Sequence, residues 1–157
     1  MTHPPNTSSA AVSAEDAGAW VTSRIGRTGF RTDATARTHS LIVDEPTTVG
    51  GADLGPTPYE FLLTALGACT AMTLRLYADR KKWPLESVTV QLRSGQSHEK
   101  DCEECPTKKV GIGTIQRRLE LEGALTDEQR TRLREIADRC PVKQTLERGI
   151  HVEAVDN

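Results

Sequence analysis

Aromatic residues are scarce in this chain of 157 residues, where Phe, Trp and Tyr together make up 4% of the sequence. The core is therefore expected to consist mainly of Leu, Ile, Val and Ala. No run approaches 18 apolar residues, so we expect no segment that spans a bilayer. The N-terminus lacks the basic and apolar parts of a signal peptide. These absences favour a cytoplasmic protein.

An excess of charge of either sign is also missing. The chain has 20 Lys and Arg residues against 22 Asp and Glu residues, which gives a net charge of -2. Such a balance creates no long-range field toward nucleic acid or an anionic membrane, and we expect neither as a partner. The adjacent acidic pairs Asp44–Glu45 and Glu103–Glu104 are expected to be solvated.

Several motifs that mark common enzyme classes are absent. The chain contains no Gly-rich phosphate loop, no H-E-x-x-H and no Ser-His-Asp order. We therefore expect no cofactor. The length fits one domain that buries a core without help from metal or disulfides. Residues 1–18, rich in Pro, Ser, Thr and Ala, are expected to be a disordered tail, and residues 19–157 a single domain.

The most apolar stretch of the chain predicts a long helix from Pro58 to about Lys82. Pro58 stands at its first position, and Thr57 with Glu60 has capping-box spacing. The apolar residues recur every three or four positions, which predicts a helix largely surrounded by protein: Phe61, Leu62, Ala65, Leu66, Cys69, Met72 and Leu76. Gly67 costs about 1 kcal/mol of helix stability relative to Ala. We expect close approach of another backbone or a ligand near Cys69 to offset that cost.

The remaining patterns predict an α+β fold. Alternating residues around Gly26 and Gly29 predict a hairpin. The full set of expected strands is 20–26, 30–37, 39–46, 88–93, 111–121 and 150–155. Two further helices are expected, one capped by Thr126 and ending at about Arg139, and one over residues 141–148.

Two cysteines are candidates for redox chemistry. Cys140 precedes a helix that begins with Pro141, where unpaired N–H groups and the helix dipole lower a thiol pKa. The alternative interpretation is that Cys140 is merely a small residue tolerated at a turn. Cys69 lies at the middle of the long helix among small residues, and its alternative is an inert buried thiol. On elements that pack together, the two would form a pair in which one thiolate attacks an oxidant and the other closes a disulfide.

The other two cysteines form a C-x-x-C motif, Cys102 to Cys105, with His98 four residues earlier. This motif serves zinc binding or redox turnover. His98 and the two cysteines supply three ligands, and His151 would be a fourth only through tertiary proximity. Neighbouring acidic residues raise thiol pKa values and disfavour rapid redox chemistry. An incidental or oxidisable surface pair is the main alternative to metal.

The chain resembles the OsmC/Ohr family of thiol peroxidases, over roughly residues 20–155. The residues that carry the resemblance form two cysteine motifs, 57–69 (Thr-Pro-Tyr-Glu-Phe-Leu-Leu to Leu-Gly-Ala-Cys) and 137–142 (Ala-Asp-Arg-Cys-Pro-Val). Residues 44–46 (Asp-Glu-Pro) and 50–56 (Gly-Gly-Ala-Asp-Leu-Gly-Pro) resemble its subgroup of OsmC-like redox proteins. The resemblance implies antiparallel sheets around a long central helix and an intertwined homodimer. It also implies reduction of organic hydroperoxides, with an external dithiol, lipoyl-type in some members, as reductant.

The same resemblance implies roles for individual residues. Cys69 becomes the peroxidatic cysteine and Cys140 the resolving one. An arginine from the early strands, held by a glutamate, assists the thiolate in this family; the candidates here are Arg24, Arg27, Arg31 and Arg37, of which we choose Arg37.

Glu60 is the glutamate in our prediction, although the usual position, ten residues before the cysteine, holds Tyr59. Nine residues along a continuous helix place Glu60 roughly opposite Cys69, where capping is its alternative role.

Three functions therefore stand after the sequence alone. The first is a cytoplasmic, dimeric thiol peroxidase with a hydroperoxide cleft beside Cys69, formed by the apolar helix face and Gly67. The second is a non-catalytic dimer that senses redox state or binds a small molecule in the same cleft. The third is a zinc-binding accessory protein built on His98, Cys102 and Cys105.

Overall fold

A computed structural model describes residues 20–96 and 112–154 of the chain. The chain divides into two compact units, residues 1–58 and 59–157, which are described separately below. The expected N-terminal tail and the C-x-x-C motif with His98 lie outside the described residues.

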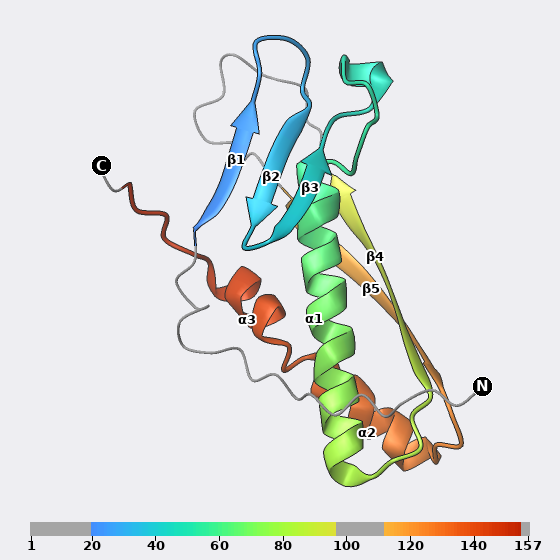
Figure 1. Cartoon of the computed structure of the whole chain (residues 1–157). Coiled ribbons are helices and arrows are strands. Elements are labelled where there is room, and N and C mark those ends of the chain that lie inside the picture. The colour runs from blue at the N-terminus through green and yellow to red at the C-terminus, as the bar shows by residue number, and fades with distance from the viewer. Residues whose placement is uncertain (1–19, 97–111, 155–157) are drawn as a thin grey trace, which may run out of the picture. The chain divides into compact units, whose positions relative to one another are not determined.

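The N-terminal unit is a three-stranded antiparallel sheet in the order β1-β2-β3 (Figure 1). Its strands are β1 (Val21–Ile25), β2 (Thr32–Ala36) and β3 (His39–Val43). The predicted hairpin is confirmed, with Ile25 opposite Thr32. A tight turn joins β2 to β3, and Arg37 occupies its left-handed position with a φ of 55°.

The loop after β3 is organised around the carboxylate of Asp44, which is 1% exposed. It accepts hydrogen bonds from the backbone N–H groups of Glu45 (2.8 Å), Ala52 (3.2 Å) and Leu54 (3.2 Å). The bond from Glu45 is the largest cause of a pKa below the usual value for Asp44, and burial opposes it. The expectation that Asp44 is solvated is therefore wrong, because backbone donors take the place of water.

The loop's glycine also has a steric reason. A Cβ at Gly51 would lie 1.7 Å from the carbonyl oxygen of Glu45, so no other residue fits without moving the backbone. The turn that surrounds Asp44 therefore depends on backbone approach as well as on the carboxylate. A short 3-10 helix, Thr47–Val49, lies within this loop and was not predicted.

The C-terminal unit places a long helix against an antiparallel strand pair. Figure 1 shows α1 (Pro58–Lys81) running along β4 (Ser87–Gln96) and β5 (Ile112–Glu122), followed by α2 (Asp127–Ala137) and α3 (Pro141–Arg148). Buried side chains from α1, β5, α2 and the loop before β4 form one core: Leu74, Ala78, Leu85, Leu121, Leu133, Ile136 and Ala137. The aliphatic composition expected of the core is thus confirmed in the described residues.

Helix α1 buries only one narrow stripe within the single chain. Leu66, Thr70, Leu74 and Ala78 are its buried residues, spaced four apart. Met72 is 65% exposed, and so a helix largely surrounded by protein is the wrong description of the isolated chain. By length and composition alone α1 would also suit a membrane, with a mean hydropathy of 1.4 over 18 residues, a property it shares with core helices of soluble proteins.

Gly67 faces a side chain rather than the backbone or ligand that we expected. A Cβ at this position would lie 3.3 Å from Cδ1 of Leu92 on β4. The glycine therefore lets α1 lie close to the strand pair, and the packing of Leu92 offsets part of its conformational cost.

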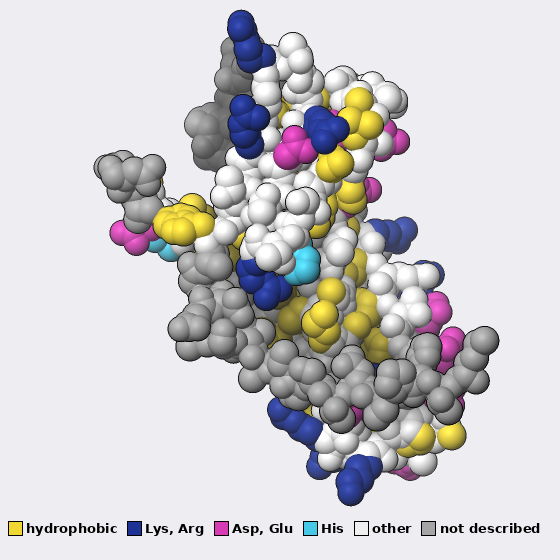
Figure 2. All heavy atoms as spheres, in the orientation of Figure 1, with side chains coloured by type: hydrophobic (Ala, Val, Ile, Leu, Met, Phe, Trp, Pro, Cys, Tyr) yellow, Lys and Arg dark blue, Asp and Glu magenta, His cyan; other side chains and the backbone are white. Residues whose placement is uncertain are grey.

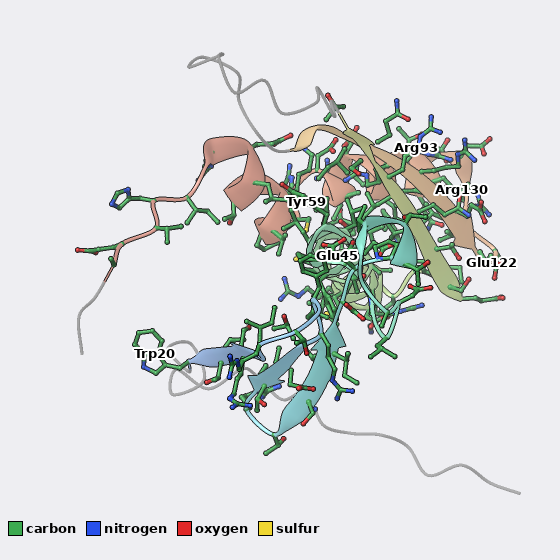
Figure 3. All side chains as sticks on the ribbon, turned by 90° about the horizontal axis from the view of Figure 1, so that it is seen from above. Trp20, Glu45, Tyr59, Arg93, Glu122 and Arg130 are labelled. Carbon is green, nitrogen blue, oxygen red and sulfur yellow. The ribbon has the colours of Figure 1, made fainter. Side chains whose placement is uncertain are left out.

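Two arginines fasten the ends of elements in this unit. Arg75 donates to the carbonyl oxygens of Leu85 (2.5 Å) and Glu86 (2.7 Å). Arg130 donates to those of Leu121 (2.6 Å) and Gly123 (3.0 Å), and Figure 3 shows it near Glu122 at the end of β5. These bonds tie side chains of α1 and α2 to the backbone where β4 begins and β5 ends.

The predictions for the C-terminal segments have mixed outcomes. Thr126 is confirmed as the N-cap of α2. Its hydroxyl accepts from the N–H of Gln129, and the Gln129 side chain accepts from the N–H of Thr126, which completes a capping box. The strand expected over 150–155 is wrong for residues 150–154, which form no regular element. Ile150 and Val152 are largely exposed. Alternation alone does not make a strand where no neighbouring strand supplies hydrogen bonds.

Candidate active site

Cys140 is the N-cap of α3, as the sequence predicts, with Pro141 at the first helical position. Its side chain is 0% exposed. Its carbonyl accepts the N–H of Gln144 (3.1 Å), which starts the helix. The sulfur makes no capping hydrogen bond of standard geometry. The nearby N–H groups of α3 therefore act on it mainly through their partial positive charge.

Cys69 lies near the middle of α1 and is half-buried. The next residue, Thr70, is fully buried, and its hydroxyl donates to the carbonyl of Leu66 (2.8 Å). The hydroxyl of Thr73 donates to the carbonyl of Cys69 itself (2.7 Å). The cysteine therefore sits in a regular helix turn that two threonines support.

The fold brings the two cysteines together as free thiols that interact with each other. One sulfur comes from the body of α1 and the other from the start of α3. The sequence-based condition for a redox pair, that the two cysteines lie on elements that pack together, is thus met within the C-terminal unit.

The surroundings separate the two thiols in acidity. Burial by itself would raise the pKa of Cys140, but the N–H of Lys143, the thiol of Cys69 and the hydroxyl of Thr70 outweigh it and hold that pKa below its ordinary value. Burial raises the pKa of Cys69, and Cys140 raises it further, against the nearby N–H of Val142. Cys140 is thus the more acidic thiol of the pair, and Cys69 is the donor toward it.

Two cavities in the C-terminal unit are lined by residues near the two cysteines in sequence, but by neither cysteine itself. One is a groove of about 430 Å³ that contains Gly67 and Ala68, immediately before Cys69, and is otherwise mostly apolar. Cys69 itself does not line it. The other, of about 600 Å³, has apolar walls and bears the charged side chains of Arg117, Lys143 and Glu147. The expected cleft with Gly67 in its wall has a counterpart in the first groove.

The arginine and the glutamate that we predicted to assist Cys69 have no contact with it that the structure establishes. Arg37 belongs to the N-terminal unit, where Arg24 and Arg27 are on or beside the exposed β1 and Arg31 pairs with Asp33 at 2.9 Å. Glu60 is exposed on the first turn of a continuous α1, so its position roughly opposite Cys69 on the helix holds. The roles of Arg37 and Glu60 stay predictions.

Across residues 20–96 and 112–154, no three His, Cys, Asp or Glu side chains are grouped so as to hold a metal ion. The zinc hypothesis depends on His98, Cys102 and Cys105, which are not among the described residues, and it stays untested.

Sequence reasoning missed Thr70 and Arg117. Thr70 contacts the sulfur of Cys140 from inside an apolar helix stripe. Arg117 lies between Ile115 and Leu119 on β5, at positions that alternate toward the core, where a charge breaks the apolar pattern. That break was a usable signal, because a buried or half-buried charge needs a specific partner.

The C-terminal unit is an antiparallel strand pair packed on one long helix. Two interacting thiols, one on α1 and one at the start of α3, make this α+β protein a candidate dithiol protein. A sequence profile described as OsmC-like protein matches residues 50–155. The chain therefore belongs to the OsmC-like protein family, which confirms the resemblance. No curated protein sequence matches that of the chain.

Solved structures agree on the fold. An OsmC-like protein from Mycoplasma pneumoniae is similar with a TM-score of 0.66 and 19% identity, over 81% of this chain and 85% of that one. An organic hydroperoxide resistance protein OsmC from Legionella pneumophila is similar with a TM-score of 0.59 and 21% identity, over 80% of this chain and 85% of that one. An OsmC-like protein of unknown function from Vibrio cholerae is similar with a TM-score of 0.61 and 13% identity, over 80% of this chain and 90% of that one. The predicted OsmC-like α+β fold is confirmed.

Proposed function

We propose that this protein is a thiol-dependent peroxidase that reduces organic hydroperoxides through a disulfide cycle between Cys69 and Cys140. The observation that carries the proposal is the pair of interacting free thiols, of which the surroundings lower the pKa of Cys140 and raise that of Cys69. Membership of the OsmC-like family supports it, as does the fold shared with a Legionella pneumophila protein named for organic hydroperoxide resistance. Free thiols also suit the cytoplasm, where we place the protein.

The first step assigns the attack to Cys69, because Cys140 is fully buried and Cys69 is the more accessible sulfur. As the Cys69 sulfur attacks the terminal oxygen of the hydroperoxide, its proton passes to the Cys140 thiolate. The O–O bond breaks, the sulfur becomes a sulfenic acid, and the alkoxide takes the proton from Cys140 and leaves as an alcohol, which restores the Cys140 thiolate. The acidic neighbour thus serves as the base that the raised pKa of Cys69 requires.

The second step uses Cys140 as the resolving thiol. Its low pKa keeps it available as a thiolate, which attacks the sulfenic sulfur of Cys69. An S–S bond forms, and the hydroxide leaves as water after protonation. An external dithiol, such as a lipoyl-type one, then returns both thiols and is itself oxidised to a disulfide.

We also propose that the working unit is a homodimer. In the single chain, the side chains of β1 are all exposed, and Trp20, which projects from the strand's start in Figure 3, is 81% exposed. Figure 2 shows apolar side chains along the course of α1 as well, where Met72 and Leu76 are largely exposed. Exposed apolar side chains of this kind, taken in each unit by itself, are typical of an interface. A second copy, intertwined with the first, would cover them.

Redox sensing is the second candidate, favoured by the raised pKa of Cys69, which slows attack on a peroxide. Turnover separates the two functions. With excess tert-butyl hydroperoxide and a dithiol, we expect each wild-type chain to consume many equivalents of hydroperoxide, in step with oxidation of the dithiol. Consumption that stops after about one equivalent per chain, with dithiol still present, would identify a sensor instead.

A further inference from the structure

Arg117 is a charged residue on the core-facing side of the strand pair. It lies directly opposite Leu92 of β4 in the antiparallel register. Its side chain is 20% exposed. A guanidinium in this position loses much of its hydration and requires defined partners. Those partners lie at the turn between α2 and α3.

The guanidinium holds that turn at two points. Nη1 donates to the carbonyl oxygen of Ala137 (3.0 Å), and Nη2 donates to Oδ1 of Asp138 (2.8 Å). The carbonyl of Ala137 also accepts the backbone N–H of Cys140 (3.4 Å). Arg117 and Cys140 therefore share one acceptor, so the arginine is linked to the cysteine through a single backbone carbonyl.

The charged side chains around the turn neutralise a carboxylate close to Cys140. The carboxylate of Asp138 is two residues from Cys140, where an uncompensated negative charge would oppose a thiolate. Arg117 pairs with it, and Nζ of Lys143 lies 3.8 Å from the same oxygen and 2.7 Å from Oε1 of Glu147. The thiol of Cys140 interacts with Cys69 and Thr70 from α1 and with the N–H groups of Val142 and Lys143. The charged groups at its turn are Arg117, Asp138 and Lys143.

We propose that Arg117 is a positioning residue for Cys140, which fixes the turn that places this thiol at the start of α3 and neutralises the carboxylate of Asp138. The proposal rests on the proposed dithiol cycle, in which Cys140 is the base and then the resolving thiolate. Arg117 itself does not touch the reacting sulfur in this role. It acts through Ala137 and Asp138.

The test is a pH titration of thiolate ultraviolet absorbance, taken as the difference between each protein and its Cys140→Ser counterpart. In Arg117→Gln we expect the Cys140 midpoint to move to higher pH, with a loss of about threefold or more in the thiolate fraction at neutral pH. Arg117→Lys keeps the charge but not the paired geometry, and its midpoint should lie between those of Arg117→Gln and the wild type. Arg118→Gln, the adjacent outward-facing arginine, serves as the matched control and should leave the midpoint in place.

Wild-type midpoints in both Arg117→Gln and Arg117→Lys would overturn the proposal. If Arg117→Gln fails to give a thermal unfolding transition, Arg117→Lys decides alone, and an unchanged midpoint overturns it. The titration uses no hydroperoxide. A lack of peroxidase turnover would therefore contradict the proposed function but not the role of Arg117. An unchanged titration midpoint would contradict the role of Arg117 but not the proposed function.

Discussion

Cys69→Ser is expected to lower hydroperoxide turnover on the order of 10³-fold or more, to the rate of the reaction without protein, because it removes the attacking sulfur. A serine hydroxyl at this site has neither the acidity nor the nucleophilicity to accept oxygen from a peroxide. Cys140→Ser is expected to behave differently. The first oxidation proceeds more slowly without the neighbouring thiolate as base, and the sulfenic acid on Cys69 then persists for lack of a partner.

Turnover with a dithiol and trapping of sulfenic acid by dimedone measure the two effects. Cys102→Ser and Cys105→Ser are matched controls, since they make the same chemical change elsewhere in the chain and should retain wild-type turnover. Equal turnover in wild type and Cys69→Ser would refute a role for this thiol. Trapped sulfenic acid on Cys140 in the Cys69→Ser variant would reverse the order of attack that we assign.

The second prediction with a large expected effect concerns the dissociation constant of the proposed dimer. Met72 and Leu76, 65% and 58% exposed in the single chain, lie on a face of α1 that a second copy would cover. Replacing both with Glu would bury unpaired charge in that interface, at a cost on the order of 3 kcal/mol or more. We expect the dimer dissociation constant to rise at least about a hundredfold, so that the double variant sediments as a monomer at concentrations where the wild type is a dimer.

Thr131→Glu adds a negative charge to an exposed position on α2 and provides the control for net charge. It should sediment as the wild type does. A wild-type protein that is monomeric at micromolar concentration would contradict the dimer. A double variant that stays dimeric would place the interface away from this face of α1.

The parts of the fold that sequence predicts well are those that local physics determines. Pro58 and the apolar spacing define α1, and Thr126 defines the start of α2. The position of Cys140 at the start of α3 follows equally from the proline after it. In each case the residues that decide the structure are within four positions of one another, so no tertiary information is required.

The features that sequence reasoning missed depend on contacts between distant segments. Asp44 is buried because the chain returns eight and ten residues later with N–H groups for its carboxylate. Arg117 finds its partners 20 and 21 residues further along. The proximity of Cys69 and Cys140 likewise joins α1 to α3, and before the structure it stood only as a condition on how these elements pack.

The two thiols have unequal environments, and this division bears on mechanism. A thiol that is half-buried in a helix and raised in pKa reacts slowly by itself, whereas the surroundings of the fully buried thiol at a helix start lower its pKa. In the proposed cycle these properties complement each other, because the accessible sulfur receives the oxygen while the acidic one accepts a proton and then closes the disulfide. Neither cysteine alone combines access with acidity.

Intact mass spectrometry of the wild-type protein, after one equivalent of an organic hydroperoxide, tests the central claim most directly. We expect the reduced mass to fall by two hydrogen atoms, a peptide map that joins Cys69 to Cys140, and full return of the starting mass after treatment with a dithiol. A stable gain of one oxygen without a disulfide, a bridge between Cys102 and Cys105 instead, or an unchanged mass would contradict the cycle.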